Sequence, residues 1–437
     1  MTDTLKLRFL GAAGQVERSA TLITVNGSKL LLDYGVQLKR PPLFPLHVSP
    51  RELSGIAVSH AHLDHSGATP FLYISGVMSA YTTPATMDLI DLLIKDFLKI
   101  SGPDLPFEFV DLQTLESKAA TMGYRERVEV PHSPFTIEFL NAGHVPGASQ
   151  ILVDMGSKRI LYTGDINSYE THLQAPADFD YGDVDVVISE STYAGETHPE
   201  RDKHEEDFAE KIRGVLEDGG IALIPTFAIG RSQEILLMLV DRGFDHEIFM
   251  DGMAVTASDI LIRHPTFLRD AHKLERALRK VNKIYEWKQR RRVVRDPCVI
   301  IAPAGMLSGG AAVFYMRRIH DDPRSAIFVV GFQSPGTPGR TLVEEKRTFI
   351  RGKERRVRAE VHNYRFSSHI DHRGFEKMFK NIRVEPIVFV VHGDPQNLEA
   401  LAGLVSEEIG LEAYVPRLGE EFEIGGSGVV GRSGTRI

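Results

Sequence analysis

The chain is 437 residues long, so its length predicts two or three compact units with ample core rather than one domain. Its composition is ordinary for a globular protein, and its formal net charge of −8 excludes a general electrostatic attraction for nucleic acid. Cys298, the only cysteine, excludes an intrachain disulfide and favours a reducing cytoplasm, and we expect neither a signal peptide nor a membrane span.

The first part of the chain has the pattern of antiparallel β-structure. Residues 5–10 alternate apolar and basic side chains, and a second strand is expected over 19–25. Asn26-Gly27 is typical of the hairpin turn that would lead into a strand at 29–33. Asp33 ends that strand, at a place where an acidic side chain commonly caps a turn.

A six-residue stretch at 60–65 concentrates three imidazoles and a carboxylate. It follows a short apolar strand expected at 54–59, and its polar members are His60, His62, Asp64 and His65. By chance this pattern should occur in roughly one such chain per thousand. Imidazole and carboxylate together suit zinc, with manganese or iron as weaker alternatives. The stretch therefore predicts a metal site at a strand end.

Further strands end in candidate ligands. The strand at 135–140 leads to His144, and the strand at 159–163 leads to Asp165. An isolated His or Asp at a strand end is more often a turn residue, but the repetition after the first cluster predicts that both are ligands. The apolar strand at 387–391 is followed by His392, and the same argument predicts that this histidine is a ligand. The helical pattern at 85–100 is expected to be core.

The middle of the chain changes character. A charged helix at 201–216, a strand at 221–225, a helix at 232–239 and strands at 299–303 and 326–330 alternate as in a doubly wound α/β unit inserted into the first. The most basic stretch, 273–295, contains Trp287 and is either a solvated helix face or a patch that guides a phosphate backbone.

The last part of the chain has less distinct patterns. The run at 351–356 reads as a hairpin edge protected by charge. A helix is expected at 396–409 and a closing pair of strands near 413–415 and 422–424. The tail at 425–437 is expected to be partly mobile.

Several motifs together carry a family resemblance. They are Ser-Glu-Ser-Thr at 189–192, Phe-Ser-Ser-His at 366–369 and Val-His-Gly-Asp at 391–394. With the cluster at 60–65, the chain resembles the β-CASP subfamily of metallo-β-lactamase-fold nucleases. Blocks at 225–234, 305–310 and 331–340 resemble its cleavage and polyadenylation specificity factor branch, whose archaeal and bacterial members are relatives of ribonuclease J.

The resemblance implies an α/β fold, an αββα metallo-β-lactamase sandwich with an inserted doubly wound β-CASP domain. The implied domains are 1–195 and 365–437 for the sandwich and 196–364 for the insertion, which we expect to lie over the metal site and leave a cleft. The resemblance also implies two zinc ions per chain. The first would be held by His60, His62 and His144, the second by Asp64, His65 and His392, with Asp165 bridging. Asp33 would steady the ligands from behind.

The implied reaction is hydrolysis of a phosphodiester. Two metal ions about 3.5 to 4 Å apart can lower the pKa of a shared water, and the resulting hydroxide would attack phosphorus. His369 would protonate the departing ribose oxygen, and Glu190 would keep that imidazole charged. Within the three blocks, the residues expected to contact substrate are Arg231, Ser308 and Arg340.

The implied function is a ribonuclease of RNA processing or decay that cuts single-stranded RNA, as an endonuclease, a 5′-to-3′ exonuclease or both. His392 favours RNA, because DNA-repair members of the family usually lack this histidine. Expected partners are single-stranded RNA, a second copy of the chain and proteins of an RNA-processing complex. Two alternatives stay open. A small-molecule hydrolase such as a lactamase or thioesterase would need neither the insertion nor His369, and a non-catalytic subunit would typically have lost ligands that are all present here.

Overall fold

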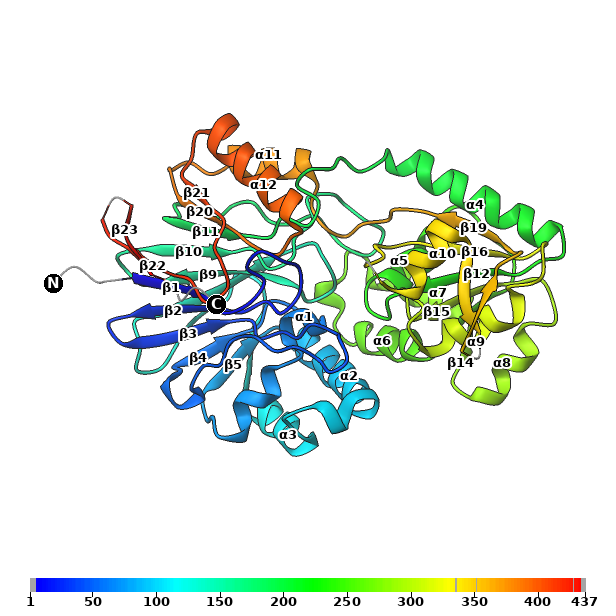
Figure 1. Cartoon of the computed structure of the whole chain (residues 1–437), viewed down its shortest axis with the longest axis horizontal. Coiled ribbons are helices and arrows are strands. Elements are labelled where there is room, and N and C mark those ends of the chain that lie inside the picture. The colour runs from blue at the N-terminus through cyan, green and yellow to red at the C-terminus, as the bar shows by residue number, and fades with distance from the viewer. Residues whose placement is uncertain (1–4, 335, 351, 427, 434–437) are drawn as a thin grey trace. The chain divides into compact units, whose positions relative to one another are not determined.

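The computed structural model describes residues 5–334, 336–350, 352–426 and 428–433. The chain forms two compact units (Figure 1). Unit 1 comprises Met1–Glu170, Ala175–Thr197 and Ser368–Ile437, and unit 2 comprises Thr171–Gln174 and His198–Ser367. Four of the segments discussed above lie partly outside the described residues. They are the start of the chain, the motif block at 331–340 (position 335), the predicted hairpin at 351–356 (Arg351) and the tail at 425–437. Across the described ranges, no helix is both long and apolar enough to cross a membrane.

Unit 1 contains two sheets. The first has the order β23-β22-β1-β2-β3-β4-β5-β6 and the second the order β21-β20-β11-β10-β9-β8-β7. The strands of the first sheet are β1 (Leu5–Phe9), β2 (Thr21–Val25), β3 (Ser28–Leu32), β4 (Gly55–Ala57), β5 (Ser79–Thr82), β6 (Ala119–Thr121), β22 (Glu421–Ile424) and β23 (Val429–Ser433). The strands of the second are β7 (Arg127–Glu129), β8 (Thr136–Asn141), β9 (Ser149–Asp154), β10 (Arg159–Tyr162), β11 (Val186–Ser189), β20 (Ile387–Val390) and β21 (Ala413–Tyr414).

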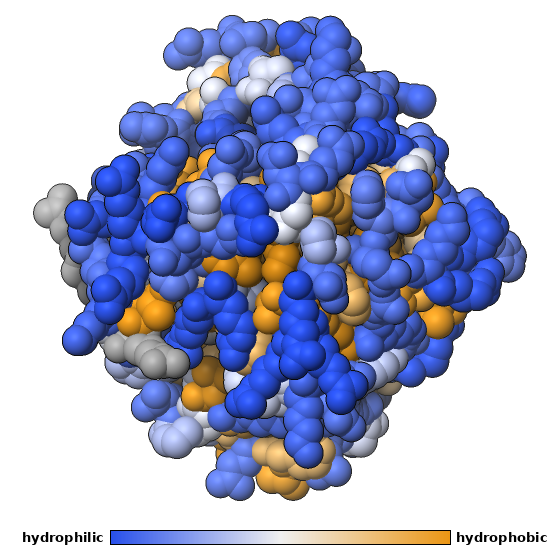
Figure 2. Space-filling model, turned by 90° about the vertical axis from the view of Figure 1, so that its right-hand side faces the viewer, coloured by the Kyte–Doolittle hydropathy of each residue, from blue (hydrophilic) through white to orange (hydrophobic). Residues whose placement is uncertain are grey.

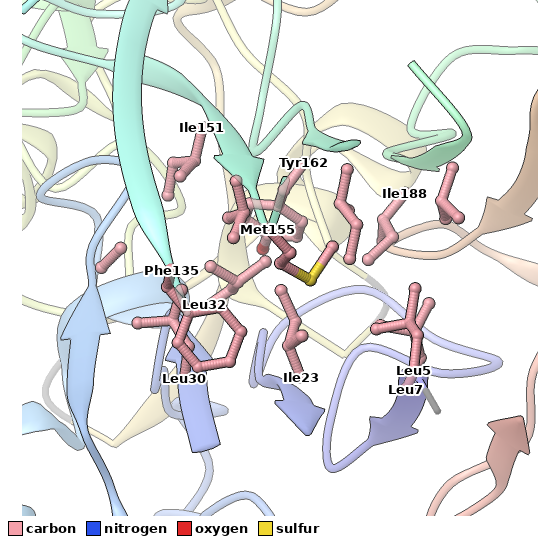
Figure 3. Packing of buried hydrophobic residues seen from close by; sticks show 14 of the residues in the cluster. Leu5, Leu7, Ile23, Leu30, Leu32, Phe135, Ile151, Met155, Tyr162 and Ile188 are labelled. Atoms are coloured by element: carbon pink, nitrogen blue, oxygen red, sulfur yellow. The ribbon is translucent and has the colours of Figure 1, made fainter. Parts of the chain in front are cut away.

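The core of unit 1 lies between the two sheets. Strand β1 alternates buried and half-buried residues, so that Leu5, Leu7 and Phe9 point into the core. They meet side chains of the second sheet such as Phe389 and Ile151, and Figure 3 shows Leu5, Ile23 and Leu32 together with Ile151 and Ile188 in this layer. Strands β11 and β20 are buried throughout, which explains their continuous apolar sequences.

Helices cover the outer faces of both sheets. Helices α2 (Pro84–Ser101) and α3 (Phe109–Lys118) lie beside the first sheet, and α11 (His372–Lys380) and α12 (Pro395–Gly403) lie beside the second (Figure 1). The short α1 (Leu63–Ser66) carries two candidate ligands. Unit 1 is therefore an αββα sandwich, which confirms the predicted fold class.

Unit 2 is built on a parallel six-stranded sheet of order β14-β13-β15-β12-β16-β19. Its strands are β12 (Ala222–Thr226), β13 (Ile248–Asp251), β14 (Asn282–Ile284), β15 (Val299–Pro303), β16 (Ala326–Val329) and β19 (Glu360–Asn363). Its helices are α4 (Arg201–Glu217), α5 (Arg231–Asp241), α6 (Met253–Leu261), α7 (Ala271–Arg279), α8 (Trp287–Val293), α9 (Gly310–Ile319) and α10 (Pro338–Glu345).

Helices pack on both faces of this sheet. Ile327 and Val329 of β16 share a core with Tyr315 of α9, whereas Phe328 contacts Phe208 of α4 with a centroid separation of 5.5 Å. Because successive residues of a strand point to opposite faces, α4 and α9 lie on opposite sides. The unit is doubly wound, as predicted. The predicted hairpin near 351–356 is also present, as β17 (Arg347–Ile350) paired with β18 (Lys353–Arg356).

The C-terminal region differs from expectation. The predicted strands near 413–415 and 422–424 do not pair with each other, because β21 pairs with β20 and β22 pairs with β1. Within the tail that was expected to be partly mobile, Val429–Ser433 forms β23 against β22. The predicted helix at 396–409 ends as α12 at Gly403 and continues in a wider π-type turn at Leu404–Ile409.

Candidate metal centre

The candidate ligands come from strand ends that the topology brings together in unit 1. Strands β10, β11 and β20 run parallel, so the residues that follow them, Asp165, Glu190 and His392, lie at one edge of the second sheet. Strands β3 and β4 are likewise parallel, and Asp33 and the stretch at 60–65 follow them. His144 lies in the connection between β8 and β9.

One group consists of three imidazoles. The Nε2 atoms of His60 and His144 each lie 3.2 Å from Nδ1 of His62. His144 Nδ1 donates a hydrogen bond to the carbonyl oxygen of Ser368 at 2.8 Å, so its Nε2 presents a lone pair to the other two rings. Three imidazole nitrogens thus converge on one small volume.

A second group combines imidazole and carboxylate. The Nε2 atoms of His65 and His392 are 3.4 Å apart, and His392 Nε2 lies 3.4 Å from Oδ2 of Asp64. His65 and His392 are buried, and the Asp64 side chain is 28% exposed. The second group therefore opens to solvent on the side of Asp64.

Asp165 lies between the two groups and offers one oxygen to each. Its Oδ2 is 3.6 Å from His60 Nε2 and 3.7 Å from His144 Nε2. Its Oδ1 is 3.2 Å from His65 Nε2 and 3.4 Å from His392 Nδ1. The carboxylate is 3% exposed, so it has little access to water as an alternative partner.

The donor set fits metal ions. Nitrogen ligands placed tetrahedrally at zinc distances lie roughly 3.3 Å from one another, close to the spacing of the three imidazoles. His62 Nε2 and Asp165 Oδ1 are buried and, among the residues described, form no hydrogen bond. A buried polar atom without a well-formed hydrogen bond costs free energy, and at Asp165, whose Oδ1 has only ion-pair contacts with His65 and His392, a bound cation would recover it.

Asp33 supports the site from behind. Its Oδ2 accepts hydrogen bonds from His65 Nδ1 at 2.6 Å, from Ser59 Oγ at 2.7 Å and from the Tyr162 hydroxyl at 2.8 Å, and its Oδ1 accepts from the Ser59 amide at 2.7 Å. Because Nδ1 of His65 is held by this carboxylate, Nε2 faces the second group. Asp33 is fully buried and its oxygens are taken up by these hydrogen bonds, so its geometry is that of a positioning residue.

Glu190 and His369 form a separate pair beside the two groups. His369 Nδ1 lies 3.2 and 3.1 Å from the two oxygens of Glu190, which also accepts a hydrogen bond from the Ile166 amide at 2.7 Å. The His369 ring lies 4.6 Å from that of His144, between centroids. Its side chain is 21% exposed while Glu190 is buried, so the imidazole is the member of the pair that reaches solvent.

The electrostatic environment divides the imidazoles into two classes. Burial lowers the pKa of three of them, which keeps them neutral as metal ligands require: His60, His62 and His144. For His65 and His392 burial acts in the same direction, but the charge of Asp165 raises their pKa above the ordinary value. Burial alone would also lower the pKa of His369, yet the Glu190 carboxylate and then Asp165 raise it to about 9.

Three family models match the chain. The metallo-beta-lactamase superfamily matches residues 13–195, the Beta-Casp domain matches residues 232–342, and a Zn-dependent metallo-hydrolase RNA specificity domain matches residues 354–416. A protein named RNase aCSPSF2 from Saccharolobus solfataricus is 37% identical over 422 residues, covering 96% of this chain and 85% of that protein. The chain belongs to the β-CASP family of metallo-β-lactamase-fold nucleases.

Other similar proteins have related names. A probable RNase MJ4 from Methanocaldococcus jannaschii is 34% identical, with 96% of this chain and all of that protein covered. A transcription termination factor, FttA, from Pyrococcus abyssi is 32% identical over 94% of this chain and 70% of its own length. A crystal structure of a protein of unknown function from Enterococcus faecalis has the same fold, with a TM-score of 0.60 and 14% identity over 96% of this chain and 100% of that one.

The residues expected to contact substrate in the β-CASP unit lie at one edge of its parallel sheet. Arg231 begins α5 after β12, Ser308 precedes α9 after β15, and Arg340 lies in the first turn of α10, which follows β16. Strands β15, β12 and β16 are neighbours, and the helices after β12 and β15 leave in opposite directions along the sheet. Ligands of doubly wound sheets bind at such a reversal. Ser308 and Arg340 are exposed, whereas Arg231 is 9% exposed.

Some residues around the candidate metal centre of unit 1 were not predicted. Ser59 and Tyr162 hold Asp33, and the Ser59 hydroxyl lies 3.1 Å from His60 Nδ1. The available signal was their position: Ser59 directly precedes His60, and Tyr162 lies two residues before Gly164. Gly164, beside the candidate ligand Asp165, packs closely against Ser59. Its φ is +52°, and a Cβ there would lie 2.8 Å from the Ser59 side chain, so the position favours glycine.

Proposed function

We propose that this protein is a zinc-dependent ribonuclease that hydrolyses phosphodiester bonds of single-stranded RNA. The observation that carries the proposal is the position of Asp165, whose two oxygens face two separate ligand groups. Such a carboxylate is suited to bridge two metal ions. We assign His60, His62 and His144 to the first ion, and Asp64, His65 and His392 to the second. When bound there, two zinc ions supply Lewis-acid chemistry, acidifying water and offsetting charge on the phosphate.

His369 is assigned to the leaving group. Its Nδ1 is held by Glu190, so its Nε2 is the nitrogen that can carry a proton to the departing ribose 3′-oxygen. The Glu190 carboxylate raises the pKa of the ring and so favours the protonated state that a general acid requires. Transfer of this proton leaves a 3′-hydroxyl on the upstream fragment and a 5′-phosphate on the downstream one. Glu190 then stabilises the ring rather than contacting the substrate.

We assign binding of the RNA strand to unit 2. We propose that Arg231, Ser308 and Arg340 contact phosphates of the RNA, because each lies at or near the start of a helix on one edge of the parallel sheet. Helix N-termini there present amide groups to anions. In this proposal residues 196–364 form the RNA-binding insertion, and residues 1–195 and 365–437 form the catalytic domain.

The names of similar proteins support RNA as the substrate. Two similar proteins are named as RNases, and the family model at 354–416 is described as an RNA specificity domain. We further propose a cytoplasmic location, in keeping with a single buried cysteine, Cys298, and association with a second copy or with other proteins of RNA processing or decay.

Labelled RNA tests the assignment directly. Zinc-loaded protein is incubated with single-stranded RNAs that carry a label at either end and a 5′-hydroxyl, monophosphate or triphosphate, beside a matched DNA, a β-lactam and a thioester. We expect RNA cleavage with 5′-phosphate products, a ladder indicating an exonuclease and discrete fragments an endonuclease. Elemental analysis should give two zinc ions per chain. Cleavage of DNA as fast as RNA, or of the lactam or thioester alone, would contradict the proposal.

A histidine variant tests the proton donor. His369→Ala should abolish cleavage while keeping both metal ions, and His272→Ala, a change at an exposed histidine of α7, should behave as the parent protein. Loss of zinc from His369→Ala would show that this imidazole is a ligand.

A further inference from the structure

An exposed basic and aromatic surface lies on unit 2, around helix α8. Between 285 and 295 the sequence has five basic residues and one acidic residue. Its two aromatic side chains, Tyr285 and Trp287, are 63% and 55% exposed. Figure 2 shows a face of unit 2 on which hydrophilic side chains dominate and hydrophobic ones show between them. We call the following set the α8 patch: Tyr285, Trp287, Lys288, Arg291, Arg292, Arg317 and Arg318.

Trp287 is fixed in place although it is exposed. Its ring packs edge-to-face on buried Phe314, with 4.5 Å between centroids. The Arg290 guanidinium lies 5.0 Å from the Trp287 ring and forms two hydrogen bonds of 2.8 Å with Asp251. Asp251 also accepts a hydrogen bond from the Tyr315 hydroxyl at 2.6 Å. The helix is thereby tied to β13 and α9, and the indole is held with half of its surface in water.

Four of the cations in the patch carry uncompensated charge. Arg290, which the sequence suggested as an RNA contact, is neutralised by Asp251. In contrast, Lys288, Arg291, Arg292 and Arg317 are all exposed and form no ion pair with any residue the structure describes.

These charges also lie close to the exposed ring. Trp287 and Arg291 are four residues apart on α8 and share one face of the helix. Arg318 covers Phe314, the ring on which Trp287 packs, at 3.5 Å from the ring centroid. Like charges clustered around an exposed aromatic ring repel one another. A ligand that neutralises them and also has planar groups to stack on the ring would therefore suit this surface.

We propose that the α8 patch binds single-stranded RNA, with bases stacked on Trp287 and Tyr285 and phosphates held by Arg291, Arg292 and their basic neighbours. Aromatic faces interleaved with unpaired cations are the chemistry by which proteins bind single strands, whose bases are free to stack. A duplex would offer phosphates but no free base faces. The choice of RNA over DNA rests on the proposed function, whereas the preference for a single strand rests on the patch itself.

The chain provides its own probe, because Trp287 is its only tryptophan. A short oligouridylate is titrated into zinc-loaded protein carrying His369→Ala, so that the RNA is not cut during the measurement. We expect the tryptophan fluorescence to be quenched with the same midpoint as the anisotropy of a labelled copy of the RNA. Unchanged tryptophan fluorescence at saturating RNA would overturn the proposal.

Substitutions separate stacking from charge. In anisotropy titrations Trp287→Ala should weaken binding by about 5-fold to 150-fold, the cost of one lost base stack, without changing the salt dependence. Trp287→Phe should restore most of the affinity. Arg291→Ser with Arg292→Ser should reduce the slope of log affinity against log salt by about 1.4, for two lost phosphate contacts.

A charge-matched pair serves as the control. Arg276→Ser with Lys280→Ser removes the same charge from two exposed positions at the end of α7, and we expect the salt slope to stay at the parent value. Parent-like affinity of Trp287→Ala, or an equal effect of the two double variants, would exclude the α8 patch as an RNA surface. Because binding is measured without cleavage, a failure here is distinct from a failure of the ribonuclease proposal, which the cleavage assay decides.

Discussion

Replacing the carboxylate behind His65 by an amide, Asp33→Asn, tests the logic of the metal centre. Three donors converge on one oxygen of Asp33 and a fourth, the Ser59 amide, reaches the other. An amide has one acceptor oxygen and one donor nitrogen, so in either orientation at least one buried N–H or O–H group faces another donor. Its neutral oxygen also holds His65 Nδ1 less firmly than a carboxylate does.

The size of the effect follows from these contacts. Removing the charge that supports a metal-ligating histidine typically lowers metal affinity 10-fold to 100-fold, or about 1.4 to 2.7 kcal/mol. We expect that loss in the group of Asp64, His65 and His392, since Asp33 contacts His65 and none of the three ligands of the other group. Without metal, the unfolding free energy should fall by about 3 kcal/mol, because the buried His65 charge loses one partner.

Zinc competition against a chromophoric chelator resolves the two affinities, and urea unfolding of the metal-free protein gives the stability. Tyr162→Phe is the matched control: it removes one donor at 2.8 Å and leaves the carboxylate, so it should cost no more than about 1.5 kcal/mol and keep both zinc affinities near those of the parent. An Asp33→Asn protein that binds two zinc ions as tightly as the parent would refute the reasoning.

Three further predictions concern activity and stability. Glu190→Gln should cleave RNA more slowly than the parent but faster than His369→Ala, because the ring keeps a neutral hydrogen-bond partner; equal rates for the two variants would contradict this. For His172, burial alone would lower the pKa, but the Glu205 hydrogen bond and the nearby carboxylates raise it, so its stabilising contribution is present below about pH 6.5 and is lost as pH rises through the raised value. Urea unfolding from about pH 6 to about pH 9 should show this loss in the parent and not in His172→Gln. Phe139→Ala, at a fully buried core position, should lower the unfolding free energy by about 3 to 5 kcal/mol, and a change below 1 kcal/mol would mean that the core refills the cavity.

The sequence predicted the fold, and it identified the candidate ligands that the structure brings together, because both follow from local patterns. His60, His62 and His65 are neighbours in the chain, and His144, Asp165 and His392 each follow a strand that apolar periodicity identifies. Parallel pairing then brings the strand ends before Asp165 and His392 together, whereas His144 lies in the connection between the antiparallel strands β8 and β9. The residue-by-residue assignment to two metal ions came from the resemblance and stays a prediction.

Contacts between residues far apart in the sequence could not be predicted from local patterns. Strand β22 pairs with β1 across almost the whole chain, and nothing in residues 421–424 specifies that partner over the nearer β21. The ion pair between Arg290 and Asp251 likewise joins positions 39 residues apart. From the sequence alone, every basic residue of the stretch at 273–295 could contact RNA, whereas the structure shows that the charge of Arg290 is neutralised by Asp251. Thr171–Gln174 belongs to unit 2 although its neighbours on both sides belong to unit 1.

The late position of His392 in the chain has a consequence for synthesis. Strand β20, which delivers this histidine, is an inner strand of the second sheet of unit 1, between β11 and β21. While the ribosome is still making the insertion, that sheet lacks two of its strands, and the centre lacks both His369 and His392. A nascent chain therefore cannot assemble the second ligand group before its last part has emerged, and the transcript being translated is not exposed to a complete catalytic centre on its own unfinished product.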